Sequence, residues 1–343
     1  MTTLDPPPTL RVGAEAADTR RRFEESVARR SEPPVVRSAL ELVGGSPMVE
    51  LTRFAAEELG QGRRADLFAK LEWLTPGGSV KDRAGLGMVL WAEAEGRLRP
   101  GGTIVEPTAG NTGIGLALAG VLRGYEVILV VPEGYAIEKI KLMQSLGATV
   151  ERSPKADGIR GAIARVRQIE EELGDAFVPM QWENEGNSGF HELTTAEEIR
   201  RQMEDRIDAV VIGVGTGGTF TGVCRALRRL HPDLLCVAVE TNGSVLQGGE
   251  PGPHEVEGIG TSFIPEILDR RLMDEVIMVH DDDSFATAKL LARSEGLLVG
   301  GSSGANAFAA LQVARRLGPG RRIVTIFPDS AERYLSKGRL GGP

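Results

Sequence analysis

The sequence has few of the residues from which disulfide frameworks and metal sites are built. Its 343 residues include two cysteines, Cys224 and Cys236, and four histidines that lie far apart. None of them stands at the spacing typical of a zinc site, so we expect two buried or inert thiols and no metal. Long apolar runs are also missing. The longest uncharged stretch, residues 107–122, contains proline, asparagine and several glycines, which excludes a standard membrane-spanning helix.

Positive charge is in the minority. The chain carries 48 acidic and 40 basic residues, which gives a formal net charge of −8. An acidic surface makes nucleic acid and anionic membranes poor partners. The N-terminus, MTTLDPPPTL, lacks the basic and then apolar order of a secretory signal. We therefore expect a cytoplasmic protein whose partners are small-molecule substrates.

What the chain does have, from Leu42 onward, is an alternation of strand and helix patterns. Short apolar runs predict strands at residues 103–105, 127–131, 209–214, 236–239 and 323–327. Helical patterns lie between them, for example at residues 159–173 and 285–293. Strands that are apolar throughout are buried on both faces, which is typical of parallel sheets covered by helices. The sequence therefore predicts an α/β fold with two doubly wound, mostly parallel-sheet domains.

We divide the chain into three parts on this basis. Residues 37–183 and 184–338 form the two expected domains, with a boundary near residues 182–188. Residues 1–36 are expected to form an N-terminal arm that begins with prolines and continues with a charged run. Few apolar residues are available to order this arm, so a solvated or frayed tail is favoured over a helix packed on a partner.

In such sheets ligands bind beyond the carboxyl ends of the strands, so we expect the catalytic and binding residues in the loops there. The first loop, GGSVKDR, has Ser79 followed by Asp82, a helix-start pattern that places Lys81 in the first turn. The helix dipole and burial would lower the lysine pKa from about 10.4 toward the range of a base or Schiff-base former. A surface lysine on an amphipathic helix is the structural alternative.

Three further loops are rich in glycine and hydroxyl groups. Residues 106–113, EPTAGNTG, suit a substrate carboxylate. Residues 213–219, GVGTGGT, lie at an expected helix start that suits a phosphate. The same loop also spells the dinucleotide pattern GxGxxG, with Glu240 at the end of the next strand. Residues 299–305, VGGSSGA, are expected between a strand and a helix and offer hydroxyls, which ordinary capping would also explain.

Together, SVKDR, AGNTG, GTGGT and GGSSGA stand in an order and at separations that resemble the cysteine synthase and cystathionine β-synthase family. The resemblance covers about residues 42–337 and includes FPDS at residues 327–330. Members of this family are fold-type II pyridoxal-phosphate enzymes, similar in fold to the tryptophan synthase β chain, and are typically homodimers. The resemblance therefore implies pyridoxal 5′-phosphate as the cofactor and a homodimer as the assembly.

The resemblance also implies a role for individual residues. Lys81 would carry the cofactor and act as the catalytic base. The residues expected to hold the cofactor phosphate are Gly215, Thr216, Gly217, Gly218 and Thr219. Asn111 would bond the 3′-oxygen of the cofactor ring, and Ser302 would face its pyridine nitrogen. The residues expected at the substrate are Thr108, Ala109, Gly110, Thr112, Gln181 and Gly258.

The chain departs from the family pattern at several of these loops. Ala109 stands where most relatives have serine, which puts a substrate contact in doubt. Thr75 stands where asparagine is usual, and residues 183–187 lack the usual Asn-Pro. We expect such changes to affect the choice of the second substrate.

The implied reaction is β-replacement on O-acetyl-L-serine, L-serine or O-phosphoserine through an α-aminoacrylate. Sulfide would give cysteine, and homocysteine would give cystathionine. A neutral serine at the ring nitrogen makes a weaker electron sink than a carboxylate would, which favours elimination over transamination. An amine nucleophile, as in a 2,3-diaminopropionate synthase, is an alternative within the fold. An NAD(P)-dependent oxidoreductase and a non-catalytic protein that kept the fold are alternatives of other classes.

Overall fold

The computed structural model describes residues 14–28, 35–60, 65–108, 110–134 and 136–340. The strands are β1 (Met48–Glu50), β2 (Asp66–Leu71), β3 (Thr103–Pro107), β4 (Glu126–Pro132), β5 (Thr149–Ser153), β6 (Ala209–Gly213), β7 (Leu235–Thr241), β8 (Glu275–Val279) and β9 (Arg322–Phe327). The α-helices are α1 (Ala14–Ala28), α2 (Thr52–Leu59), α3 (Lys81–Glu95), α4 (Asn111–Leu122), α5 (Ile137–Ser145), α6 (Gly158–Leu173), α7 (Glu185–Phe190), α8 (Ala196–Gln202), α9 (Gly218–Leu230), α10 (Asp281–Glu295) and α11 (Gly301–Leu317). A π-helical turn, η3 (His191–Thr195), joins α7 to α8, and a 3₁₀ segment, η5 (Ala331–Lys337), follows β9.

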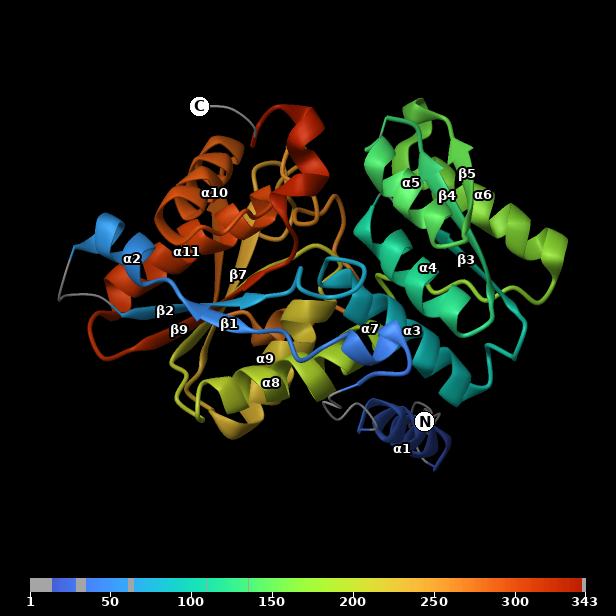
Figure 1. The fold of residues 1–343 in the computed structure, drawn as a ribbon, viewed down its shortest axis with the longest axis horizontal. Coiled ribbons are helices and arrows are strands. Elements are labelled where there is room, and N and C mark those ends of the chain that lie inside the picture. Colours follow the sequence, from blue (N-terminus) through green and yellow to red (C-terminus); the bar gives the residue numbers. More distant parts are fainter. Residues whose placement is uncertain (1–13, 29–34, 61–64, 109, 135, 341–343) are drawn as a thin grey trace, which may run out of the picture.

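The larger of two lobes is built on a six-stranded sheet in the order β1-β2-β9-β6-β7-β8. All neighbouring pairs are parallel except β1 with β2, which are antiparallel at one edge. Helices α10 and α11 cover one face, and α8 and α9 cover the other (Figure 1). Successive residues of β6 enter different cores: Val211 packs in the cluster with α11, and Val210 packs in the cluster with α9. The strand is apolar throughout because both of its faces are covered.

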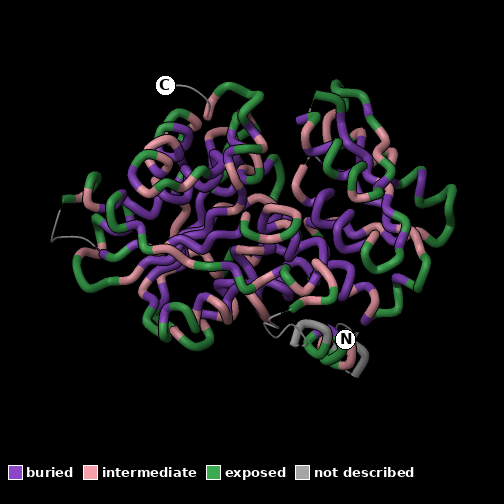
Figure 2. The backbone as a smooth tube through the Cα atoms, viewed as in Figure 1, coloured by how far each residue is buried: buried purple, intermediate pink, exposed green. Residues whose placement is uncertain are grey.

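The smaller lobe is built on the parallel sheet β3-β4-β5. On β4, Val127 and Leu129 face the core shared with α3 and α4, whereas Val130 packs with α6 on the opposite face. Buried backbone follows the strands of both sheets and the central helices (Figure 2). The predicted α/β class with parallel, doubly covered sheets is confirmed. Among the described helices, none combines the length and the apolar character needed to cross a membrane.

Two sequence expectations differ from the structure in the way segments are joined. β1 and β2, at residues 48–71, belong to the larger sheet, where β2 pairs with β9. Residues 182–188 do lie between β5 of the smaller sheet and β6 of the larger one, but the chain also passes from the larger to the smaller sheet between β2 and β3. The loop at residues 299–305 follows helix α10 rather than a strand, and Val299 makes only an isolated bridge to Ser330.

The N-terminal arm also differs from expectation where it is described. Ala14–Ala28 forms helix α1, and its Phe23 is fully buried. The Phe23 ring lies edge-on to Trp91 of α3, with 5.1 Å between ring centroids, and 6.4 Å from Phe190 of α7. This aromatic contact, together with hydrogen bonds from Arg20 to Glu192 at 3.4 Å and from Arg22 to the Ala94 carbonyl at 3.3 Å, docks this part of the arm on its own chain instead of leaving it as a solvated tail. The rest of the arm, residues 1–13 and 29–34, lies outside the described residues.

Candidate active site

Lys81 is the first residue of α3, as the helix-start pattern predicts. The Ser79 hydroxyl accepts a hydrogen bond from the Lys81 backbone N–H at 3.3 Å. Burial lowers the pKa of the Lys81 amine, and the nearby Asp329 carboxylate partly opposes that shift. A lowered amine pKa is what a lysine needs in order to act as a base or to attack a carbonyl group.

Asp82 does not close a capping box with Ser79, although the sequence pattern suggests one. Its carboxylate instead accepts hydrogen bonds from the Thr75 hydroxyl at 2.6 Å and from the Gly77 N–H at 2.7 Å. Burial raises the pKa of Asp82 to about 6, and these two donors act against the shift. Thr75, one of the departures from the family pattern, therefore fixes the loop that leads into Lys81.

The substrate loop after β3 turns directly into α4. The Thr108 hydroxyl accepts hydrogen bonds from the N–H groups of Gly110 and Gly113, both at 3.2 Å. The buried Thr112 hydroxyl donates to the Gln181 side-chain oxygen at 2.6 Å. Four of the residues expected at the substrate are thus held in two hydrogen-bonded pairs, Thr108 with Gly110 and Thr112 with Gln181. Ala109 lies outside the described residues.

Glu106, at the end of β3, holds Gln181 in place and was not predicted as a site residue. Its carboxylate accepts the N–H groups of Met180 at 2.8 Å and Gln181 at 3.1 Å. Burial raises its pKa to about 8, and the two N–H donors oppose that change. Met180 has a φ of 51°, an unfavourable left-handed conformation for a side-chain-bearing residue. The carboxyl group stabilises this turn, which brings Gln181 to Thr112.

The glycine-rich loop of residues 213–219 leads from β6 into α9, so free N–H groups of a helix start face outward from it. Gly217 has a φ of 88°, which favours glycine. A Cβ on Gly215 would lie 2.2 Å from the Gly258 carbonyl oxygen, so only glycine permits this close approach. Two predicted elements, the phosphate loop and Gly258, are therefore adjacent.

These segments, which come from both lobes, line one cavity of about 670 Å³. The predicted site residues that line it are Lys81, Thr108, Gly110, Asn111, Thr112, Gln181, Gly215, Thr216, Gly217, Thr219, Gly258 and Ser302. Ser302 is buried in the first turn of α11. Gly218 does not line the cavity, because it packs against Asn187 behind the loop.

A chain of polar contacts at the same cavity was missed by sequence reasoning. Asn111 donates to the buried Asp329 carboxylate at 2.7 Å, and the Tyr334 hydroxyl donates to the same oxygen. Lys139 lies 4.5 Å from the centre of the Tyr334 ring and pairs with Glu257 at 2.6 Å. A signal for Asp329 was present, since FPDS stands at the carboxyl end of a predicted strand. Lys139 has no such signal, because its partner is 118 positions away.

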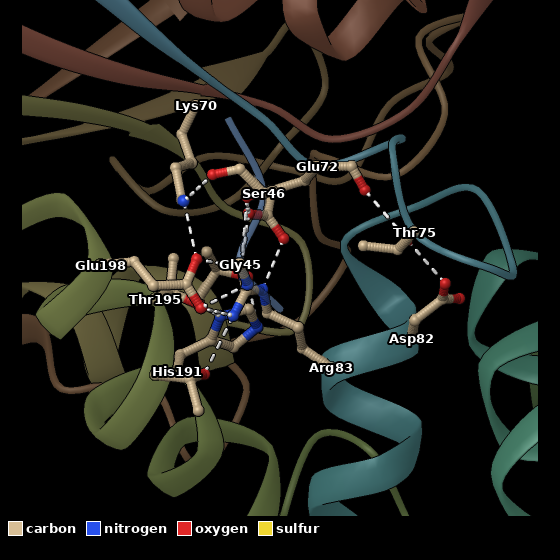
Figure 3. Close-up of polar contacts among 12 residues, drawn as sticks. Gly45, Ser46, Lys70, Glu72, Thr75, Asp82, Arg83, His191, Thr195 and Glu198 are labelled. Carbon is tan, nitrogen blue, oxygen red and sulfur yellow. Dashed lines mark hydrogen bonds and ion pairs between the residues drawn. The ribbon is translucent and has the colours of Figure 1, made fainter. Parts of the chain in front are cut away.

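A second polar cluster begins two residues after Lys81. Arg83 extends from α3 and is fully buried between Glu72, at 2.6 Å, and Glu198 of α8, at 2.7 Å (Figure 3). Burial acts to lower the Arg83 pKa, but the two carboxylates raise it overall, so the guanidinium stays charged. The buried Lys70 pairs with Glu198 at 2.7 Å. These ion pairs join α3 to the end of β2 and to α8.

The fold and the cavity define an α/β enzyme in which a lysine, a glycine-rich helix start and a substrate loop meet between two lobes. A family model described as pyridoxal-phosphate dependent enzyme matches residues 39–329. A cysteine synthase of Staphylococcus aureus (strain Mu50 / ATCC 700699) is 44% identical over 298 residues, which cover 86% of this chain and 94% of that protein.

Solved structures give the same result. An O-acetylserine dependent cystathionine β-synthase from Helicobacter pylori is 41% identical with a TM-score of 0.84, covering 90% of this chain and 100% of that one. An O-ureido-L-serine synthase is 37% identical with a TM-score of 0.85, covering 90% and 96%. The chain belongs to the cysteine synthase and cystathionine β-synthase family of fold-type II pyridoxal-phosphate enzymes. It is an enzyme of PLP-dependent β-replacement.

The residues present fit this cofactor better than a dinucleotide. Lys81 can bind an aldehyde, the start of α9 suits a phosphate, and Ser302 offers a neutral hydroxyl. Glu240, which a dinucleotide would need for its ribose, is buried and accepts hydrogen bonds from Leu246 N at 3.1 Å and Gln247 Nε2 at 2.8 Å. The dinucleotide alternative is therefore wrong.

Proposed function

We propose that the chain makes cysteine from O-acetyl-L-serine and sulfide, with acetate as the leaving group. The observation that carries this proposal is the convergence of Lys81, the loop at residues 106–113 and the loop at residues 213–219 on one cavity. In the net reaction the Cβ–O bond to acetate breaks and a Cβ–S bond forms. The Cα proton leaves in the first half and returns in the second.

Lys81 is the residue that we propose to take and return that proton at its Nζ. Because burial lowers its pKa, more of the amine is neutral near pH 7 than for an exposed lysine. The neutral amine is the form that accepts a proton. When bound at this site, pyridoxal phosphate would supply the electron sink for the charge that develops at Cα, and the amine of Lys81 is then free to take the proton.

The substrate carboxylate is proposed to bind at the start of α4. The positive end of that helix favours an anion, and the Thr108 hydroxyl, which accepts two N–H groups, keeps its own hydrogen to donate. Since Gln181 accepts the Thr112 hydroxyl through its side-chain oxygen, its amide N–H groups are available to the carboxylate. Asn111 and Ser302 are proposed to contact the cofactor ring, and residues 215–219 its phosphate.

A second acceptor, homocysteine, is favoured by the size of the cavity. A volume of about 670 Å³ lies in the middle of the range, ~300–1,000 Å³, of pockets that hold ligands of drug size. We propose that the part of this volume not taken by the cofactor and the donor receives an amino-acid thiol. In that case the product would be cystathionine, and the Lys81 chemistry would be the same.

The test is a titration of the purified holoenzyme followed by visible absorbance and by acetate release. We expect O-acetyl-L-serine, and neither L-serine nor O-phosphoserine, to change the cofactor band and to release one acetate per site. Sulfide should then restore the band and yield cysteine, and homocysteine is added in parallel to compare the acceptors. A band that responds only to one of the other donors would contradict the proposal.

Lys81→Ala tests the catalytic base separately. We expect turnover to fall by at least about 10²-fold, because general-base catalysis contributes on that scale. Lys141→Ala, which changes an exposed lysine on α5, is the matched control and should leave turnover unchanged. Equal rates in the two variants would show that Lys81 does not move the proton.

A further inference from the structure

We propose that Asn187 and His191 are positioning residues that direct the hydroxyl hydrogens of Thr216 and Thr219 toward the cofactor phosphate. The inference rests on the role proposed above for residues 215–219. It adds the residues that orient the hydroxyl groups of Thr216 and Thr219. Asn187 and His191 are four positions apart on the continuous segment from α7 to η3, so they share one face of it. That face packs behind the glycine-rich loop, where a Cβ on Gly218 would lie 2.1 Å from Asn187 Oδ1.

The orientation of the Asn187 amide is fixed by its neighbours. Its Nδ2 donates to the Gln181 backbone carbonyl at 2.9 Å, and a carbonyl can only accept. The same Nδ2 donates to Thr216 Oγ1 at 3.1 Å. Thr216 Oγ1 therefore accepts a hydrogen bond on the side of the loop that faces Asn187. Its own hydrogen is free to point into the cavity that Thr216 lines.

His191 makes the equivalent contact with the other threonine. Its Nε2 lies 3.1 Å from Thr219 Oγ1, and its Nδ1 lies 2.8 Å from Thr195 Oγ1. The residue is fully buried in the π-helical turn η3, a type of irregularity often found at functional sites. Burial first, and then the charges of Arg83 and Lys81, hold the pKa of His191 well below its usual value, against the opposing Glu198.

The ring is therefore neutral, and one of its two nitrogens carries a hydrogen. A phosphate oxygen only accepts, so Thr219 must donate to it and accept from behind. This requires hydrogen on Nε2 of His191 and a Thr195 hydroxyl that donates to Nδ1. The hydrogen bonds then run in one direction, from Thr195 through His191 to Thr219 and the phosphate, which strengthens each of them.

The experiment compares two ligands that differ only in the phosphate. Dissociation constants of pyridoxal phosphate and of pyridoxal are measured for the full-length apoprotein and for His191→Phe and His191→Gln. His191→Phe keeps a ring but offers no N–H, whereas the Gln amide can reach the place of Nε2 and donate. We expect His191→Phe to weaken pyridoxal phosphate about 10-fold or more, with pyridoxal unchanged, and His191→Gln to restore most of the loss.

Asn187→Asp gives an independent arm, because it replaces the donor by an acceptor of the same shape. It should also weaken pyridoxal phosphate more than pyridoxal. Equal losses for both ligands, or no rescue by His191→Gln, would overturn the inference and leave the two residues a packing role only. If the variants behave as expected while O-acetyl-L-serine fails to react, the proposed function falls and this inference stands.

Discussion

Burial shifts the pKa values of individual residues around Lys81 toward the neutral form of each group. Burial lowers the pKa of Lys81 and raises those of Asp82 and Glu106 to about 6 and about 8. All three changes favour the neutral form, as expected where a site is removed from water. The two acids hold backbone turns on either side of the cavity, so their ionisation is linked to the stability of the site.

Asp82 gives a pH-dependent prediction. Its pKa in the folded chain is raised from 3.8 to about 6, so the folded state binds the proton more tightly than the unfolded state does. The stabilisation is complete below pH 4 and is lost as the pH rises through 6. Relative to Asp82→Asn, wild type should therefore lose up to about 3 kcal/mol of unfolding free energy between pH 4 and pH 7.

Urea unfolding of both proteins at pH 4 and pH 7 measures this difference. The amide of Asp82→Asn keeps an oxygen for the Thr75 and Gly77 donors and does not titrate, so its constant cost cancels. A difference between the two proteins that does not change with pH would show that Asp82 keeps its ordinary pKa.

At the scale of elements, the segment α7–η3–α8 contacts three separate parts of the molecule. Its first helix packs against Phe23 of α1, its π-helical turn contacts Thr219 of the loop proposed to hold the cofactor phosphate, and α8 supplies Glu198 to the buried ion pairs. The sequence alone predicts none of this, because a buried histidine in an amphipathic pattern cannot be told from an ordinary core residue. The motifs that were predicted are loops at the ends of apolar strands, where position along the sheet restricts what a residue can do.

Helix α1 gives a prediction at this scale. Phe23→Ala removes a fully buried ring from its contacts with Trp91 and Phe190 and should cost about 2–4 kcal/mol, less than a central core phenylalanine because α1 can detach. Arg21→Ala is the control: its pairs with Asp18 and Glu25 are exposed, so it should leave the free energy of unfolding nearly unchanged. Chemical denaturation compares the two. Equal, small costs would mean that α1 is not docked in solution.

At the scale of the whole molecule, the sequence predicts the class of fold and the loops of the cavity but not how the lobes are joined. Apolar runs report local burial, so β3, β4, β6, β7 and β9 appear where strands are expected, whereas β5 and β8 were not predicted. The pairing of β2 with β9 joins residues 66–71 to residues 322–327 and depends on contacts that leave no local pattern. The same holds for Lys139 with Glu257. The homodimer and the cytoplasmic location stay predictions.

Arg83 forms ion pairs between the two lobes, and it gives the last prediction. It lies two positions after Lys81 on α3, which packs against α4 in the smaller lobe, while its partners Glu72 and Glu198 belong to the larger lobe. Arg83→Met leaves two buried carboxylates without their main cation, and we expect a cost of about 3–5 kcal/mol in the free energy of unfolding. Arg83→Lys keeps the charge but cannot span both carboxylates, so its cost should be intermediate.

Arg165→Met is the matched control, since Arg165 also bridges two carboxylates, those of Glu151 and Glu172, but at the surface. Arg165→Met should change the free energy of unfolding far less than Arg83→Met does, because exposed ion pairs contribute little. Urea unfolding measures the loss of unfolding free energy in each of the three variants. Equal losses in Arg83→Met and Arg165→Met would refute a stabilising role for the buried ion pairs of Arg83. The expected order would instead mean that buried ion pairs with the larger lobe stabilise α3 at Arg83, two positions after Lys81.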